Sequence, residues 1–132
     1  MNVKTAYNHN WKIGETVYGI IHYKKFKYGH DVIVPVEERP LKVISVHRTG
    51  DINNGFLTVG FEFELGHLMS DTTIIIHRYL KKNGYHYKVR QGNRYKRTDV
   101  ILHKFFNRNN AEKQWKHEYI EYNKLIDSYK NV

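Results

Sequence analysis

Basic side chains are concentrated in one stretch of the chain, from Thr72 to Thr98. This window carries eight of the 22 lysines and arginines and none of the 13 aspartates and glutamates. The rest of the chain holds 14 basic and 13 acidic residues, so nearly all of the formal net charge of +9 arises in the window. Four tyrosines and two histidines are interleaved with the charges. A one-sided positive charge mixed with aromatic rings indicates an anionic partner, above all nucleic acid.

Asn83-Gly84 lies between two β-like runs in this window and predicts a hairpin, because a type I′ turn requires a positive φ at both central residues. A two-residue turn here places Tyr79 opposite Lys88. Directly opposed residues of an antiparallel pair lie on the same face. The register therefore predicts an amphipathic hairpin whose apolar face also carries Arg78. The predicted cationic face consists of His77, Tyr79, Lys81, His86, Lys88 and Arg90.

The candidate binding residues continue beyond this face. Lys82 lies at its rim, and a basic run of Arg94, Lys96 and Arg97 follows it. Lysine and arginine would neutralise phosphates, and Tyr79 would be available to stack on a base. The same residues could dock on an acidic surface of a partner protein or simply keep the surface solvated. A surface that served only solubility would intersperse acidic residues, so the composition favours an anionic partner.

Residue patterns for catalysis are sparse. Glu62 and Glu64 share a strand face, and paired carboxylates can hold the metals of a nuclease, but a second acidic cluster is absent from the sequence. A metal-independent ribonuclease would use histidine and arginine as acid, base and phosphate clamp, and His77, His86 and Arg90 share the predicted hairpin face. A binding face would contain the same residues. The sequence thus predicts a non-enzymatic protein and leaves the ribonuclease as an alternative.

Several function classes are excluded by composition and spacing. The chain has no cysteine, so disulfides, thiolate metal sites and cysteine nucleophiles are ruled out. Its nine histidines show no zinc-binding spacing, and no glycine-rich phosphate loop occurs, so neither a metal nor another cofactor is expected. The N-terminal residues lack an apolar run, and no stretch approaches the roughly 20 apolar residues that span a bilayer. We therefore expect a cytoplasmic protein with no membrane partner.

The elements that must position these residues are predicted to be mostly strands. Phe56–Leu65 alternates between apolar and polar residues, a pattern typical of a half-buried strand. Pro35 removes one ladder donor from the run DVIVPV, which predicts an edge strand or a bulge, and EERP after it predicts a loop. About seven short strands are expected, including residues 16–23, 31–36, 41–48, 56–65 and 100–105.

A C-terminal helix is predicted over about residues 109–129. Asn109 followed three residues later by Glu112 resembles a capping box. Apolar and aromatic residues recur every three or four positions, which indicates one stripe facing the core: Ala111, Trp115, Tyr119, Tyr122, Ile126 and Tyr129. The fold class is then mainly β (α+β), a small twisted antiparallel sheet or barrel with a protruding hairpin and this helix. We expect a single domain (1–132) with a flexible arm (1–12), a β region (13–106) and the helical end (107–132).

Three segments carry a resemblance to a known group of proteins. They are W-K-I-G-E-x-V-Y near the start, L-K-V-I-S-V in the middle and F-F-N-R-N-N-A-E-K-Q-W near the end. The chain resembles small phage and bacterial proteins in which an SH3-like (KOW/Tudor-like) barrel is followed by a helix. The resemblance covers both ends of the chain and does not include the hairpin. It implies an SH3-like barrel and a mobile-element origin, and no single activity.

These observations predict a small basic, phage-encoded binding protein without enzymatic activity. Its cationic hairpin would contact nucleic acid, DNA or RNA with weak sequence preference, or a nucleic-acid-handling host complex. The first alternative is an inhibitor or adaptor that docks on an acidic surface of a host enzyme, in host takeover or anti-defence. The second alternative is the metal-independent ribonuclease. The oligomeric state is left open.

Overall fold

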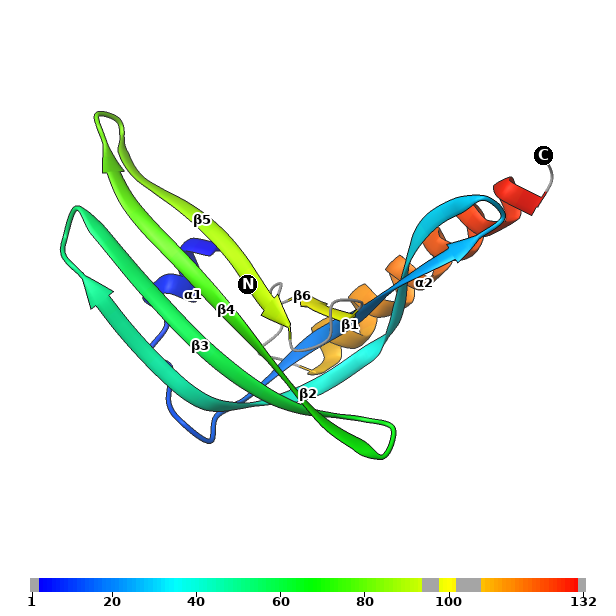
Figure 1. Cartoon of the computed structure of the whole chain (residues 1–132), viewed down its shortest axis with the longest axis horizontal. Coiled ribbons are helices and arrows are strands. Elements are labelled where there is room, and N and C mark those ends of the chain that lie inside the picture. The colour runs from blue at the N-terminus through cyan, green and yellow to red at the C-terminus, as the bar shows by residue number, and fades with distance from the viewer. Residues whose placement is uncertain (1–2, 94–97, 102–107, 131–132) are drawn as a thin grey trace.

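The computed structural model describes residues 3–93, 98–101 and 108–130, which form one antiparallel sheet of six strands and two helices (Figure 1). The sheet order is β5-β4-β3-β2-β1-β6, and the sheet curls into a half-barrel. The strands are β1 (Thr16–Lys27), β2 (His30–Gly50), β3 (Asn54–Leu65), β4 (Leu68–Lys81), β5 (Gly84–Asn93) and β6 (Thr98–Ile101). The helices are α1 (Val3–Asn8) and α2 (Arg108–Lys130). The predicted mainly β fold with a C-terminal helix is confirmed.

β2 runs unbroken through a segment where the sequence predicts a loop. Residues 37–40 pair with β1, and Pro40 lies opposite Tyr18. The predicted loop is wrong because this part of β2 needs only one strand neighbour: β3 pairs with β2 only from Lys42 onward. A proline is tolerated on such an open edge, where its missing N–H interrupts no ladder. Two predicted strands thereby join into one of 21 residues.

Pro35 lies beside a β-bulge, one of the two outcomes that its position predicts. The register between β1 and β2 shifts between Ile21 and His22, which leaves Val36 as an extra residue in β2. On the open side of β2, the indole Nε1 of Trp115 donates a hydrogen bond of 3.2 Å to the carbonyl oxygen of Pro35. This bond attaches α2 to an edge of β2 that none of the described strands covers.

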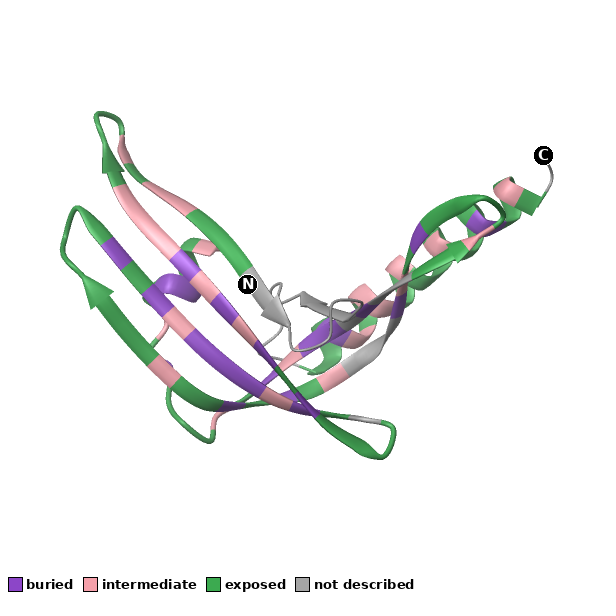
Figure 2. Cartoon of the chain, viewed as in Figure 1, coloured by how far each residue is buried: buried purple, intermediate pink, exposed green. Residues whose placement is uncertain are grey.

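The main core lies on one face of the curled sheet (Figure 2). The alternation predicted for β3 decides which face this is, because Leu57, Val59 and Phe61 are fully buried and Phe63 nearly so. Neighbouring strands add residues whose side chains point to the same face of the sheet. The largest of these contributions are Val17, Leu41, Val43, Ile74 and Ile76.

Residues 3–12 are packed on this core and are not the flexible arm that their polarity predicts. α1 buries Ala6 and Tyr7, and Trp11 follows it into the core. The Trp11 ring meets Phe61 edge-on, with 5.5 Å between centroids, and its Nε1 donates a 2.7 Å hydrogen bond to the carbonyl of Ala6. Two aromatic side chains therefore supply the burial that orders an otherwise polar segment.

α2 covers the opposite end of the sheet, where it packs on β1 and β2 (Figure 1). It spans one residue more at each end than predicted, within the usual uncertainty of helix boundaries. Ala111 and Ile126 of the predicted stripe are buried, and Trp115 and Tyr122 are half-buried. Tyr119 is 42% exposed, so its assignment to the core is wrong. Neither described helix has the length and apolar character needed to cross a membrane.

Gly55 and Gly60 of β3 provide a matched test of how α1 is held. A Cβ added at Gly55 would meet the hydroxyl of the buried Tyr7, whereas one at Gly60 would meet the hydroxyl of the exposed Ser45, which can rotate away. We expect Gly55→Ala to lower the free energy of unfolding by about 1–3 kcal/mol and Gly60→Ala by less than about 1 kcal/mol, measured by urea denaturation. Equal losses would contradict a close fit of Tyr7 against β3.

Candidate nucleic-acid interface

The β4–β5 hairpin turns one residue earlier than predicted, at residues 82–83. Tyr79 pairs with His86 and not with Lys88. Gly84 has a φ of 112°, and the turn residues before it have negative φ values. The predicted type I′ turn needs a positive φ at both central residues and is therefore absent from this hairpin. The predicted pairing is therefore wrong by two residues.

An error of two residues leaves every side chain on its predicted face, because the side chains of a strand alternate with a period of two. Six predicted residues consequently share the face of β4 and β5 that is turned away from the main core, which we call the outer face. They are His77, Tyr79, Lys81, His86, Lys88 and Arg90. Lys82 lies in the turn at the tip of the hairpin, and Arg94, Lys96 and Arg97 lie outside the described residues.

Four aromatic rings form a continuous row across the outer face. The rings of Phe56 and His77 are stacked, with centroids 4.3 Å apart and planes inclined by 5°. His77 then contacts Tyr79 at 5.1 Å, and Tyr79 stacks on His86 at 5.6 Å. The row, which we call the aromatic row, links β3, β4 and β5. Cross-strand pairs of this kind hold neighbouring side chains in fixed positions.

Two lysines of the outer face are held over Tyr79. The Nζ atoms of Lys81 and Lys88 lie 5.5 Å and 5.4 Å from the centroid of its ring. A cation–π contact at an exposed site contributes about 0.5–1 kcal/mol, enough to favour one orientation of a flexible side chain. With two histidines and two lysines against it, the Tyr79 ring is not the open stacking platform that the sequence predicts. It holds the cations in place.

Hydrogen bonds fix both histidines of the aromatic row. The Nε2 of His77 donates to Oδ1 of Asn54 at 3.0 Å, and the Nε2 of His86 donates to Oδ1 of Asn83 at 2.8 Å. Sequence reasoning missed Asn54 and also Phe56, which extends the row onto β3. Phe56 has a visible signal, because it is the one large apolar residue on the wet face of an alternating strand. Its stacking partner could not be predicted, since His77 lies 21 positions away.

The outer face is hollowed beside the aromatic row. The hollow has a volume of about 470 Å³. Apolar atoms form one part of its wall, and the exposed cations Lys88 and Arg90 form another part. Its lining residues are Phe56, Ile75, His77, Lys88, Val89 and Arg90. A site of this composition can hold a phosphate against the cations and a flat apolar group beside them.

Arg78 points to the opposite face, as predicted, and the structure accounts for a cation there. Its guanidinium lies 4.7 Å from the ring centroid of Tyr7 and 4.4 Å from that of Tyr85. Guanidinium groups stack well on aromatic faces because they are planar and weakly hydrated. Arg78 thus joins α1 to the hairpin and adds no charge to the outer face.

The acidic residues of β3 lie at the other end of its wet face. Glu62 pairs with Lys42 on one side and Asp71 on the other, and Glu64 pairs with Met69. Within the described part of the chain, no group of three or more histidine, aspartate or glutamate side chains could hold a metal ion. The two carboxylates lie on the half-buried to exposed face of β3, at the end away from the Asn54–Tyr79 pair that borders the basic hairpin.

Comparison with protein-family models, curated proteins and solved structures finds no match to this chain. The resemblance to SH3-like barrel proteins therefore stays a prediction. Inferences about function accordingly rest on the geometry of the outer face and on the chemistry of its side chains.

The turn geometry predicts a strong dependence on Gly84. A Cβ there meets open space, but alanine rarely adopts a φ of 112°. We expect Gly84→Ala to lower the free energy of unfolding by about 1–2 kcal/mol in urea denaturation. Lys82→Ala in the same exposed turn should change it by less than about 0.5 kcal/mol. A Gly84→Ala protein as stable as the parent would contradict a φ at this position that only glycine adopts readily.

Proposed function

We propose that the protein binds nucleic acid through the outer face of β4 and β5. The observation that supports this is the pair of ammonium groups, Lys81 and Lys88, that Tyr79 holds side by side within the aromatic row. Arg90 and Lys82 add exposed cations. The sequence from 72 to 98 contains no aspartate or glutamate that could neutralise them. Such a surface attracts a phosphate backbone. Binding is then favoured by the entropy of the counterions that the nucleic acid releases.

The restraint of these two lysines favours a role in binding a polyanion over a role in solubility alone. A lysine that serves solubility gains nothing from being restrained, and restraining it costs side-chain entropy. Here Tyr79 restrains both Lys81 and Lys88, and the two histidine rings in contact with Tyr79 are themselves held by hydrogen bonds to Asn54 and Asn83. A binding surface benefits from such restraint, because less entropy is lost when the ligand arrives.

Binding without catalysis is the function that the histidine geometry supports best. Tyr79 lies between His77 and His86 in the aromatic row, and the Nε2 of each histidine is engaged by an asparagine. A ribonuclease needs an acid and a base on opposite sides of one phosphate, each with a free nitrogen directed at it. We therefore propose a backbone-binding protein of the cytoplasm with weak preference for sequence, acting on DNA or RNA.

Salt-dependent binding tests this proposal. A short labelled DNA duplex titrated with the protein in fluorescence anisotropy should give a straight line of log K against log salt. If about five to eight phosphates are neutralised, its slope should be about −4 to −7. The Lys81→Glu, Lys88→Glu double variant should lose binding while its melting temperature stays within a few degrees of the parent, since both lysines are exposed.

A matched control separates the outer face from overall charge. The Lys12→Glu, Lys113→Glu variant changes the net charge equally at two exposed positions outside the hairpin and should bind like the parent. Equal losses in the two double variants would contradict a localised site. Absence of binding to duplex and single strands at low salt would overturn the proposal, and one protein partner recovered after nuclease treatment would then favour docking on an acidic surface.

A further inference from the structure

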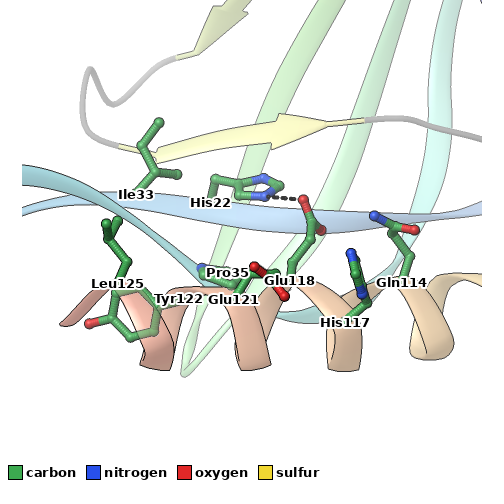
Figure 3. Close-up of a pocket in the computed structure, with 9 residues that line it drawn as sticks. All are labelled: His22, Ile33, Pro35, Gln114, His117, Glu118, Glu121, Tyr122 and Leu125. Atoms are coloured by element: carbon green, nitrogen blue, oxygen red, sulfur yellow. Dashed lines mark ion pairs between the residues drawn. The ribbon is translucent and has the colours of Figure 1, made fainter. Parts of the chain in front are cut away.

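A second pocket lies between α2 and the strands β1 and β2, at the end of the sheet that α2 covers (Figure 3). Its volume is about 470 Å³, within the range of small-molecule sites. Its walls come from β1, β2 and one face of α2. The lining residues are His22, Ile33, Pro35, Gln114, His117, Glu118, Glu121, Tyr122 and Leu125.

A buried histidine and a carboxylate meet in this pocket. His22 is only 6% exposed, and its Nε2 lies 3.4 Å from Oε1 of Glu118 (Figure 3). Nδ1 of His22 and Oε2 of Glu118 are both buried and have no hydrogen-bond partner within the described part of the chain. A buried polar atom without a partner costs about 1–3 kcal/mol, so two such atoms at one pocket indicate a ligand with hydrogen-bond donors.

The charge balance of the pocket is negative although the chain is strongly basic. The second acidic lining residue, Glu121, is paired with Lys124 at 3.4 Å. Within the described residues, the one ion-pair partner of Glu118 is His22, which is charged only if protonated. Among the described residues, Glu118 is thus a carboxylate without a permanent cation beside it. Such a site attracts a cation and repels phosphates, which sets it apart from the outer face.

Apolar groups form the rest of the wall. Ile33 and Leu125 are 62% and 42% exposed, and the ring of Tyr122 lies with them along the pocket (Figure 3). A bare metal ion would leave this surface uncovered, and the described residues hold no group of ligands for one. A ligand with an apolar body would cover it and gain from its burial.

We propose that this pocket binds an organic cation, an amidinium, guanidinium or ammonium group carried on an apolar body. The N–H donors of the cation pair with the carboxylate of Glu118, and its apolar part lies against Ile33, Tyr122 and Leu125. The Nε2 of His22 lies 3.4 Å from Oε1 of Glu118, so the imidazole ring packs beside the carboxylate and limits how it can turn. The site is independent of the proposed nucleic-acid function, because it lies on other strands and selects the opposite charge.

Isothermal titration calorimetry with benzamidine as the probe tests the proposal on the full chain. Benzamide is nearly identical in shape but neutral, and benzoate carries the opposite charge. Benzamidine should bind at least tenfold more tightly than benzamide, and benzoate should not bind. Glu118→Gln should weaken benzamidine binding at least tenfold.

Glu112→Gln is the matched control for the helix. It removes the same charge from α2, but Glu112 pairs with Lys116 at 3.2 Å and does not line the pocket. This variant should bind benzamidine like the parent. Equal binding of benzamidine and benzamide, or an affinity unchanged in Glu118→Gln, would overturn the proposal.

Two further probes identify the source of the cation. Spermidine represents free polyamines, and N-acetyl-arginine amide represents an arginine side chain of a peptide. Tighter binding of either one, lost in Glu118→Gln, supports the proposal and assigns its natural source. An affinity for either probe that is unchanged in Glu118→Gln, in a protein with an unchanged circular dichroism spectrum, would overturn it.

Discussion

Burial of one face of the curled sheet is the constraint on which the rest of the structure depends. Phe61 and its neighbours on β3 need a cover, and Trp11 with α1 provides it. Because strand side chains alternate, the same pairing that places Ile76 inside places His77 and Tyr79 outside. The outer face is thus a consequence of how the core is packed, and the cations of β4 and β5 other than Arg78 lie there because they alternate with positions on the opposite face.

The local pattern of apolar and polar residues is sufficient to predict the parts of the fold that depend on periodicity. The alternation of β3 and the stripe of α2 are both visible in the sequence, and the hairpin face keeps its residues despite a wrong turn type because the error is an even number of residues. The Tyr28-Gly29 turn takes the two positive φ values, 50° and 78°, that the sequence predicts for Asn83-Gly84. The two dipeptides alone favour the reverse outcome, because asparagine tolerates a positive φ better than tyrosine does.

The parts that sequence reasoning missed depend on contacts between distant residues. α1 is ordered by its fit against β3, and β2 admits its prolines where β3 does not pair with it and α2 lies beside the open edge. His22 and Glu118 are 96 positions apart, so no motif could join them. The two sites proposed for this protein also differ in kind. The outer face presents restrained cations to solvent, whereas the pocket under α2 holds Glu118, whose one ion-pair partner among the described residues is a histidine.

Chemical-shift mapping of the backbone amides during titration with a short DNA oligonucleotide at low salt tests the proposed nucleic-acid interface most directly. We expect the largest changes on β4 and β5, at His77, Tyr79, Lys88 and Arg90, with the amides of α2 unchanged. Changes centred on α2 and the β1–β2 hairpin, or the absence of any change, would contradict binding through the outer face.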